Sequence, residues 1–140
     1  MATTPETPVY TAHASVTGGR AGHATTDDGR LDVTLSQPGS SGNGTNPEQL
    51  FAAGYAACFQ SAMGSVARQQ GLDVSKSVID SSVSLYRGDA SYHLGVAMKV
   101  TIPGMALDQI QALVDAAHQV CPYSNATRGN IAVTFEVANA

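Results

Sequence analysis

Residues 46–71 read NPEQLFAAGYAACFQSAMGSVARQQG, and this stretch has the pattern of a long helix. Asn46 is a favoured N-cap, Pro47 suits the first helical position, and Gly71 suits the end of a helix. The stretch therefore predicts one long helix that ends near residue 70. Small and apolar residues cover most of its faces, which is typical of a helix buried at the centre of a domain.

The segments on both sides of this helix alternate apolar and polar residues, as half-buried strands do. Before the helix, turn signals at Gly18-Gly19 and Asp28-Gly29 separate three short strands within residues 10–35. After it, the pattern predicts strands near 83–85 and over 92–102, a helix over 107–120, a further helical turn at 124–128 and a last strand over 131–137. The order βββ-α-ββ-α-β predicts an α+β fold with a mostly antiparallel sheet.

The composition describes one folded domain with few charges. The chain has 140 residues, of which 43% are hydrophobic and 13% are charged, and this excludes a disordered chain. We expect a single domain over residues 1–140, with residues 1–8 as a flexible tail. The low charge also indicates that a partner subunit covers part of the surface.

The charge balance excludes several classes of partner. The net charge is −4, and the 7 Lys and Arg residues are scattered, whereas nucleic acids and anionic membranes require a basic stripe. The first residues, MATTPETPVYTAHA, lack the basic and apolar regions of a secretory signal. No apolar run approaches the ~20 residues of a membrane span. We therefore expect a cytoplasmic protein with no nucleic-acid or membrane partner.

The sequence does not predict a bound metal or cofactor. The four histidines, at positions 13, 23, 93 and 118, do not have metal-ligand spacing with one another or with a cysteine, and there is no CxxC motif. The Gly/Ser-rich segment 36–45 lacks the Lys-Ser/Thr pair of a phosphate-binding loop.

The two cysteines are the candidate reactive groups. Cys58 lies about 18 Å from the start of the long helix, so the helix dipole lowers its pKa little. Its thiol is then unreactive near its ordinary pKa of about 8.5 unless a cation is brought to it, and a buried core cysteine is the competing interpretation. Cys121 follows a helix that Pro122 cannot continue. The negative end of that helix disfavours a thiolate, so Cys121 is a plausible second nucleophile or an apolar filler.

Two blocks centred on these cysteines carry a family resemblance. GTNPEQLFAAGYAACF (44–59) and AAHQVCPYSNATRGNI (116–131) resemble the signature blocks of the organic hydroperoxide resistance (Ohr) family, within the wider group of osmotically inducible protein C (OsmC). VTGGRAG (16–22) and LDVTLSQPG (31–39) are similar to further parts of that family, so the resemblance covers the chain from Tyr10 onward. It implies an OsmC-like α+β fold with mostly antiparallel sheets around a long central helix, in an intertwined homodimer.

The resemblance also implies an activity and a set of site residues. Cys58 corresponds to the family's peroxidatic cysteine and Cys121 to its resolving cysteine, while Arg20 and Glu48 correspond to its arginine and glutamate. The implied reaction reduces alkyl, aryl and fatty-acid hydroperoxides to alcohols through a Cys58 sulfenic acid and a Cys58–Cys121 disulfide. Lipoylated proteins, rather than thioredoxin, would restore both thiols, with no metal or prosthetic group. Taken singly, Arg20 also fits a solvated loop charge, and Glu48 a favourable first-turn residue.

Two other functions fit the residues. The first is a Cys-His hydrolase that uses Cys58 and His118, although no oxyanion motif accompanies Cys58 and His118 neighbours the other cysteine. The second is a non-enzymatic protein that binds a hydrophobic ligand, with both cysteines as core filler. Apolar residues along the helix near Cys58 are expected to form the wall for an apolar ligand or substrate tail: Phe51, Ala57, Phe59, Ala62 and Met63.

Helix geometry separates two of the implied site residues. Glu48 and Cys58 lie ten residues apart on one helix, which places them about 15 Å apart along its axis. A glutamate side chain does not span that distance. The sequence therefore predicts a two-fold dimer in which each site takes Cys58 and Cys121 from one subunit and Glu48, with Arg20, from the other.

Overall fold

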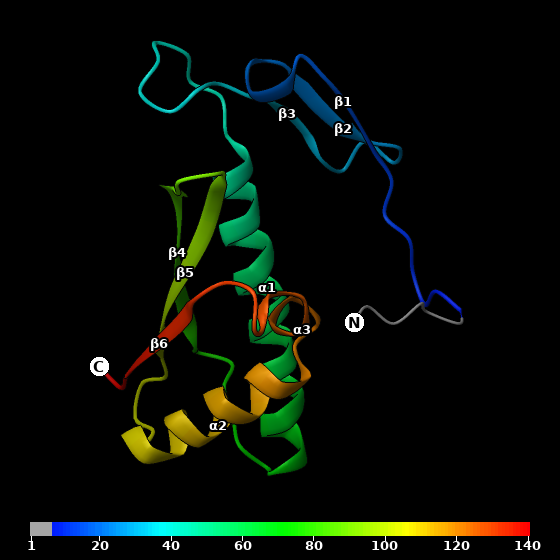
Figure 1. Ribbon diagram of the computed structural model, residues 1–140. Helices are drawn as coiled ribbons and strands as arrows, with labels where there is room; N and C mark the ends of the chain where they lie inside the picture. The colour runs from blue at the N-terminus through cyan, green and yellow to red at the C-terminus, as the bar shows by residue number, and fades with distance from the viewer. Residues whose placement is uncertain (1–6) are drawn as a thin grey trace. The chain divides into compact units, whose positions relative to one another are not determined.

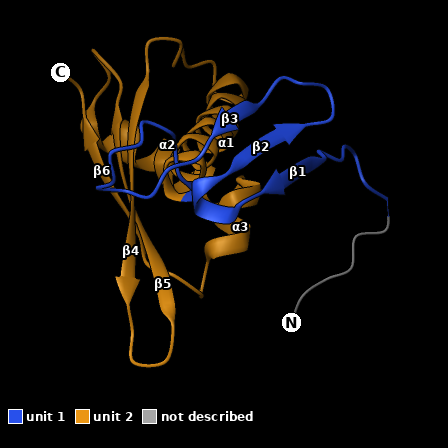
Figure 2. Cartoon of the chain, turned by 90° about the horizontal axis from the view of Figure 1, so that it is seen from above, with its two compact units in different colours: residues 1–47 blue, residues 48–140 orange. Residues whose placement is uncertain are grey.

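The computed structural model describes residues 7–140 of a chain that divides into two compact units, Met1–Pro47 and Glu48–Ala140 (Figure 2). The expectation of a single domain over residues 1–140 stays a prediction. Residues 1–6 of the expected flexible tail lie outside the described residues. Pro8, the last residue of that tail, is exposed.

The first unit is a small antiparallel sheet. Strands β1 (Ala14–Thr17), β2 (His23–Thr26) and β3 (Asp32–Thr34) pair in the order β1-β2-β3 (Figure 1). The alternation that begins at Tyr10 predicts an earlier start for β1, whereas residues 10–13 lie outside it and are exposed.

Glycines shape the turn between β1 and β2. Gly18 has φ 75°, and the chain then makes the short 3-10 turn η1 (Gly19–Ala21), which contains Arg20. A Cβ atom on Gly22 would lie 1.7 Å from the carbonyl oxygen of Thr17, so this position accepts only glycine. The predicted Gly18-Gly19 turn is confirmed.

The second unit begins with the long helix α1 (Pro47–Gln69), followed by strands β4 (Val78–Arg87) and β5 (Tyr92–Thr101). Helices α2 (Leu107–Val120) and α3 (Pro122–Thr127) then lead to strand β6 (Val133–Ala138). The sheet order is β4-β5-β6, with β5 antiparallel to β4 and parallel to β6. The α+β class and the order of elements are confirmed. Strand β4 begins earlier than its apolar residues indicate. The helical turn expected at 124–128 is part of the separate helix α3.

The core of the second unit lies where α1 and α2 cover one face of the β4-β5-β6 sheet (Figures 1 and 2). Alternate residues of β5 point into it because successive strand side chains face opposite sides. The buried residues of this core are Tyr55, Phe59, Met63, Ala67, Val96, Met98, Val100, Ile102, Ile110, Leu113, Val114, Ala117 and Cys121.

Helix α1 supplies one buried face to the core. Its fully buried residues form one stripe through Tyr55, Phe59, Met63 and Ala67, while the stripe that contains Ala53 is exposed. The helix is also long and apolar enough, by length and composition, to cross a membrane, so the expectation that no segment reaches that limit is wrong. The core helix of a soluble protein passes the same test, and α1 supplies core residues here.

Candidate functional site

The two cysteines meet in the second unit. The sulfur atoms of Cys58 and Cys121 lie 3.6 Å apart, with the Cys121 thiol donating a hydrogen bond to Cys58. Both are free thiols, and Cys121 is fully buried whereas Cys58 is half-buried. A reagent that approaches from solvent therefore reaches Cys58 first.

Cys121 reaches this position because it joins two helices. Helix α2 ends at Val120, and Cys121 itself has an extended backbone, with φ −67° and ψ 126°. Pro122 then begins α3, for which Cys121 is the N-cap. The sequence correctly placed Cys121 beyond the end of α2, but the start of a second helix at the same residue was missed.

The surroundings of Cys58 act on its pKa in both directions. Burial raises the pKa of this thiol most, and the neighbouring Cys121 raises it further through its hydrogen bond and its charge. The backbone N–H of Tyr123 donates a hydrogen bond to the sulfur and lowers the pKa. Because Pro122 has no N–H, Tyr123 supplies the first amide of α3. The net result is a pKa above the ordinary value of a cysteine.

An aromatic wall stands beside the thiols. The rings of Phe51, Tyr55 and Tyr123 lie 5.7 to 6.0 Å apart, centre to centre. The hydroxyl of Tyr123 lies over Gly54, where an added Cβ atom would be 3.4 Å from it. Gly54 is one helical turn before Cys58, so the wall adjoins the Cys58 sulfur.

This wall corrects the expected lining. Phe51 belongs to it, but Phe59 and Met63 are fully buried in the core and face away from solvent. Phe59 stacks instead on Phe135, at 4.9 Å between ring centres. Tyr123 was missed, although its place two residues after a candidate cysteine is a signal that could have found it.

A chain of buried hydrogen bonds lies next to the thiols. The Tyr55 hydroxyl is 2.8 Å from Ser124 Oγ and 3.2 Å from Thr127 Oγ1. Ser124 Oγ is also 2.7 Å from His118 Nδ1. Burial lowers the pKa of His118 most and the charge of Arg128 lowers it further, against an opposing effect of Asp115. His118 thus hydrogen-bonds to Ser124 through Nδ1, and sequence reasoning did not find this network.

The other two site residues implied by the resemblance lie apart from the thiols in sequence and helix position. Glu48 is half-buried in the first turn of α1, ten residues before Cys58 on the same helix. Arg20 belongs to the first unit, in the turn after β1. The structure brings Cys58 and Cys121 together, and the places of Arg20 and Glu48 in one site stay a prediction.

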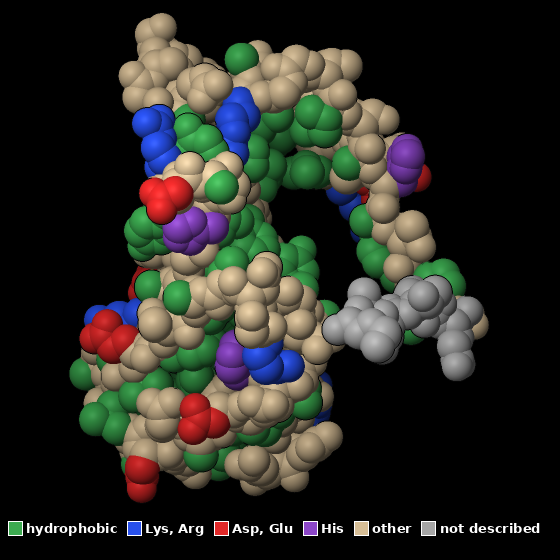
Figure 3. Space-filling model, in the orientation of Figure 1, with side chains coloured by type: hydrophobic (Ala, Val, Ile, Leu, Met, Phe, Trp, Pro, Cys, Tyr) green, Lys and Arg blue, Asp and Glu red, His purple; other side chains and the backbone are tan. Residues whose placement is uncertain are grey.

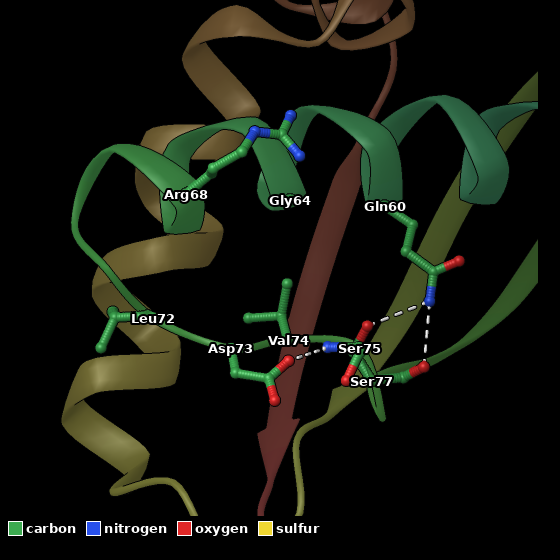
Figure 4. Close-up of a pocket in the computed structure, with 8 residues that line it drawn as sticks. All are labelled: Gln60, Gly64, Arg68, Leu72, Asp73, Val74, Ser75 and Ser77. Atoms are coloured by element: carbon green, nitrogen blue, oxygen red, sulfur yellow. Dashed lines mark hydrogen bonds between the residues drawn. The ribbon is translucent and has the colours of Figure 1, made fainter.

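A separate hollow of about 450 Å³ lies between α1 and the segment that connects it to β4 (Figure 4). Gln60 donates hydrogen bonds to the backbone oxygen and the hydroxyl of Ser77 at one side of it, and Arg68 lines it from α1. Neither cysteine lines this hollow. Among residues 7–140, no three His, Cys, Asp or Glu side chains gather as metal ligands would.

Fold and site together define a class of protein. A long helix presents one accessible thiol, and a junction between two shorter helices holds a second, buried thiol against it. This is an α+β protein with a dithiol centre.

Comparison with known proteins identifies the family. Residues 39–136 match the family model of the OsmC-like proteins. The chain is 54% identical to the organic hydroperoxide resistance protein of Xanthomonas axonopodis pv. citri (strain 306), over 96% of this chain and 98% of that protein. It is 46% identical to the organic hydroperoxide resistance protein OhrB of Bacillus subtilis (strain 168), over 92% of this chain and 98% of that protein.

Solved structures agree with the sequence comparison. The crystal structure of Bacillus subtilis OhrB superposes with a TM-score of 0.88 at 44% identity, covering 93% of this chain and 99% of that one. An organic hydroperoxide resistance protein from Legionella pneumophila gives 0.88 at 47% identity, covering 94% and 99%. This chain belongs to the OsmC family, in its organic hydroperoxide resistance (Ohr) branch. The resemblance and the OsmC-like α+β fold that it implied are confirmed, whereas the homodimer stays a prediction.

Proposed function

We propose that this chain is a thiol peroxidase that reduces organic hydroperoxides to alcohols, with Cys58 as the first nucleophile and Cys121 as the second. The observation that carries the proposal is the 3.6 Å contact between an accessible and a fully buried thiol. The names of the relatives, which are organic hydroperoxide resistance proteins, support the substrate class.

The reaction proceeds in two steps within the dithiol centre. The Cys58 thiolate attacks one oxygen of the peroxide, the O–O bond breaks, and the alcohol leaves after taking a proton, so that Cys58 becomes a sulfenic acid. The Cys121 sulfur then attacks the oxidised sulfur, forming a disulfide and releasing water. An external dithiol, for which we propose a lipoylated protein, reduces the disulfide by thiol–disulfide exchange.

Activation of Cys58 requires a cation. The second unit by itself raises the pKa of Cys58, mainly by burial, so the thiol needs a positive charge to ionise near neutral pH. We assign this charge to Arg20, whose guanidinium is always ionised and offers forked donors to a peroxide oxygen. Glu48 orients the guanidinium, and because α1 separates Glu48 from Cys58, both helpers come from the partner subunit.

The proposed assembly is an intertwined homodimer. In the first unit only two hydrophobic residues, Ala24 and Leu35, are buried among the described ones, while Tyr10 and Val16 are exposed. A three-stranded sheet of this size gains little stability unless its apolar face is covered. Hydrophobic side chains are also exposed over the second unit on the face drawn in Figure 3, and charged ones are few. These exposed apolar surfaces support the dimer, because a second copy of the chain would cover them. We also propose a cytoplasmic location, because a reducing compartment keeps two cysteines as free thiols.

The geometry favours a peroxidase over a Cys-His hydrolase. His118 directs Nδ1 to Ser124 rather than to Cys58, and the group that contacts Cys58 is a second thiol. A protein that only binds hydrophobic ligands has no need for two thiols in contact.

The test is a count of free thiols before and after one equivalent of cumene hydroperoxide. We expect two thiols to disappear per chain while one equivalent of alcohol is released. The Cys58→Ser variant, which keeps only the Cys121 thiol, is the control and should lose no thiol. Retention of both thiols in the unsubstituted protein would reject the peroxidase and leave a hydrolase or a binding protein.

A further inference from the structure

The buried polar chain beside the dithiol centre contains four contacts. They join His118 Nδ1 to Ser124 Oγ at 2.7 Å, Ser124 Oγ to the Tyr55 hydroxyl at 2.8 Å, the Tyr55 hydroxyl to Thr127 Oγ1 at 3.2 Å, and Thr127 Oγ1 to the backbone oxygen of Ser124 at 3.2 Å. Tyr55 and Ser124 are fully buried and Thr127 is 6% exposed. These hydroxyls therefore cannot rely on bulk water for partners.

A count of hydrogen atoms fixes which group donates in each of these four hydrogen bonds. Each of the four contacts needs one hydrogen, and a serine, a tyrosine and a threonine hydroxyl supply only three. The backbone oxygen of Ser124 supplies none. The fourth hydrogen must come from His118 Nδ1, which then donates to Ser124. Ser124 donates to Tyr55, Tyr55 to Thr127, and Thr127 to the backbone oxygen, so every contact is satisfied.

The charge state of His118 depends on its surroundings rather than on the count of hydrogen atoms. Burial and the nearby charge of Arg128 lower its pKa, which favours the neutral ring at neutral pH. A neutral histidine carries one ring proton, so with Nδ1 protonated its Nε2 is an acceptor.

The place of this chain in the fold connects it to the thiols. Tyr55 is one helical turn before Cys58 on α1, and its hydroxyl binds Ser124 of α3. Ser124 directly follows Tyr123, whose backbone N–H donates to the Cys58 sulfur. His118, from the last turn of α2, holds the same serine. These hydrogen bonds thus connect α1, α2 and α3 at the point where Cys121 contacts Cys58.

From this arrangement we propose that Tyr55 and Ser124 are positioning residues for the dithiol centre, held in register by His118 with its proton on Nδ1. They hold the first turn of α3 so that the Tyr123 amide and the Cys121 thiol both face the Cys58 sulfur. The use of this positioning in peroxide reduction rests on the proposed function. The proton arrangement and the effect on thiol chemistry do not depend on the proposed function.

The first measurement is ¹⁵N NMR of the His118 ring in the unsubstituted protein, at a pH where the ring is neutral. We expect Nδ1 to carry the proton and Nε2 to show the shift of an unprotonated ring nitrogen. In Ser124→Ala this preference should weaken. An unprotonated Nδ1 in the unsubstituted protein would overturn the proton chain, and this test does not depend on whether any variant folds.

The second measurement follows disulfide closure without peroxide, using 4,4′-dithiodipyridine. Cys58 attacks the reagent, releasing one thiopyridone and leaving a mixed disulfide on its sulfur. Cys121 then displaces the second thiopyridone and forms the Cys58–Cys121 disulfide, so the second release times the closing step. The reagent supplies the oxidising disulfide, so a result here is independent of peroxidase activity.

The variant Tyr55→Phe removes one hydroxyl and keeps the ring, and the matched control Tyr86→Phe makes the same change at an exposed tyrosine of β4. In Tyr55→Phe and Ser124→Ala we expect the second release to slow on the order of tenfold, the size of effect that loss of one buried hydrogen bond produces. The pH midpoint of the first release should also rise, because the Tyr123 amide is held less firmly. Tyr86→Phe should change neither.

Stability is measured in parallel by thermal unfolding. A purely structural role predicts a lower Tm with unchanged release rates in the folded protein, and that result would refute positioning. Unchanged rates at an unchanged Tm would refute it as well.

Discussion

The sulfur atom of Cys121 lies 3.6 Å from that of Cys58, although 63 positions separate the two residues in the chain. Cys121 is fully buried, whereas Cys58 is half-buried. Unequal access to solvent gives the two thiols an order of reaction, and contact between them allows the second to follow the first. The roles proposed for the cysteines can be separated experimentally on this basis.

Replacement of each cysteine should have a different effect. Cys58→Ser should abolish turnover, because no accessible thiol remains. Cys121→Ser should still allow one rapid oxidation of Cys58, which then proceeds to sulfinic acid for lack of a resolving thiol. Stopped-flow oxidation followed by mass spectrometry checks both outcomes. Equal loss of the first oxidation in the two variants would contradict the assignment.

Arg20 should control the pH at which Cys58 reacts. The surroundings within its own unit raise the pKa of Cys58 above the ordinary value of a cysteine, mainly by burial, and the guanidinium is expected to lower it. A raised pKa means a smaller thiolate fraction at pH 7 and slower alkylation there. We expect the alkylation midpoint of Arg20→Met to lie above that of the unsubstituted protein, with Arg20→Lys between them.

The measurement is the rate of iodoacetamide modification of Cys58 across pH 5 to 10 in a Cys121→Ser background, which leaves one thiol. Coincident midpoints for the Arg20→Met variant and its parent would show that Arg20 does not act on Cys58.

The aromatic wall should select for the organic tail of the substrate. Phe51 packs against Tyr123, at 6.0 Å between ring centres, and offers apolar surface beside Cys58. Burial of apolar area contributes about 25 cal/mol per Å², so a contact of about 60 Å² corresponds to roughly tenfold in kcat/KM. Phe51→Ala should lose about that factor for cumene hydroperoxide and little for hydrogen peroxide, which has no tail.

Steady-state assays with the two peroxides test this prediction. Ala53→Gly, on the exposed stripe of the same helix, is the control for a change in α1 itself. Equal losses with both peroxides would mean that Phe51 supports the helix rather than the substrate. The unsubstituted protein should prefer the organic peroxide by orders of magnitude.

The reductant should be a lipoyl dithiol. Dihydrolipoamide is expected to sustain turnover far better than thioredoxin in a coupled assay with the same peroxide. This prediction rests on family resemblance, and thioredoxin outperforming dihydrolipoamide at equal concentration would reverse it.

Subunits should share their active sites. Glu48 and Cys58 are ten residues apart on α1, about 15 Å along the axis, so one chain does not bring them together. Cys58→Ser and Glu48→Ala, each inactive alone, should regain activity when unfolded and refolded together. Random pairing yields one complete site per heterodimer, or about a quarter of full activity per chain. Proven heterodimers that stay inactive would exclude the shared site.

Local sequence patterns predicted the order of the helices and strands in this protein. Local rules placed the end of α1 just before Gly71, which has φ 70°, and the end of α2 before Pro122. Alternation identified β5, and the resemblance of two cysteine-centred blocks identified the family. These features were predictable because helix periodicity, proline and glycine act through neighbouring residues.

The site itself depends on contacts between segments that are distant in the sequence. Contact between Cys58 and Cys121, the Tyr123 amide at the Cys58 sulfur, and the hydrogen bonds of Tyr55 to α3 all join segments far apart in the chain. Periodicity also could not tell that Phe59 faces the core while Phe51 faces Tyr123, since both lie on an apolar helix. Which apolar face is buried depends on the packing of α1 against the sheet and α2, and packing is a property of the whole fold.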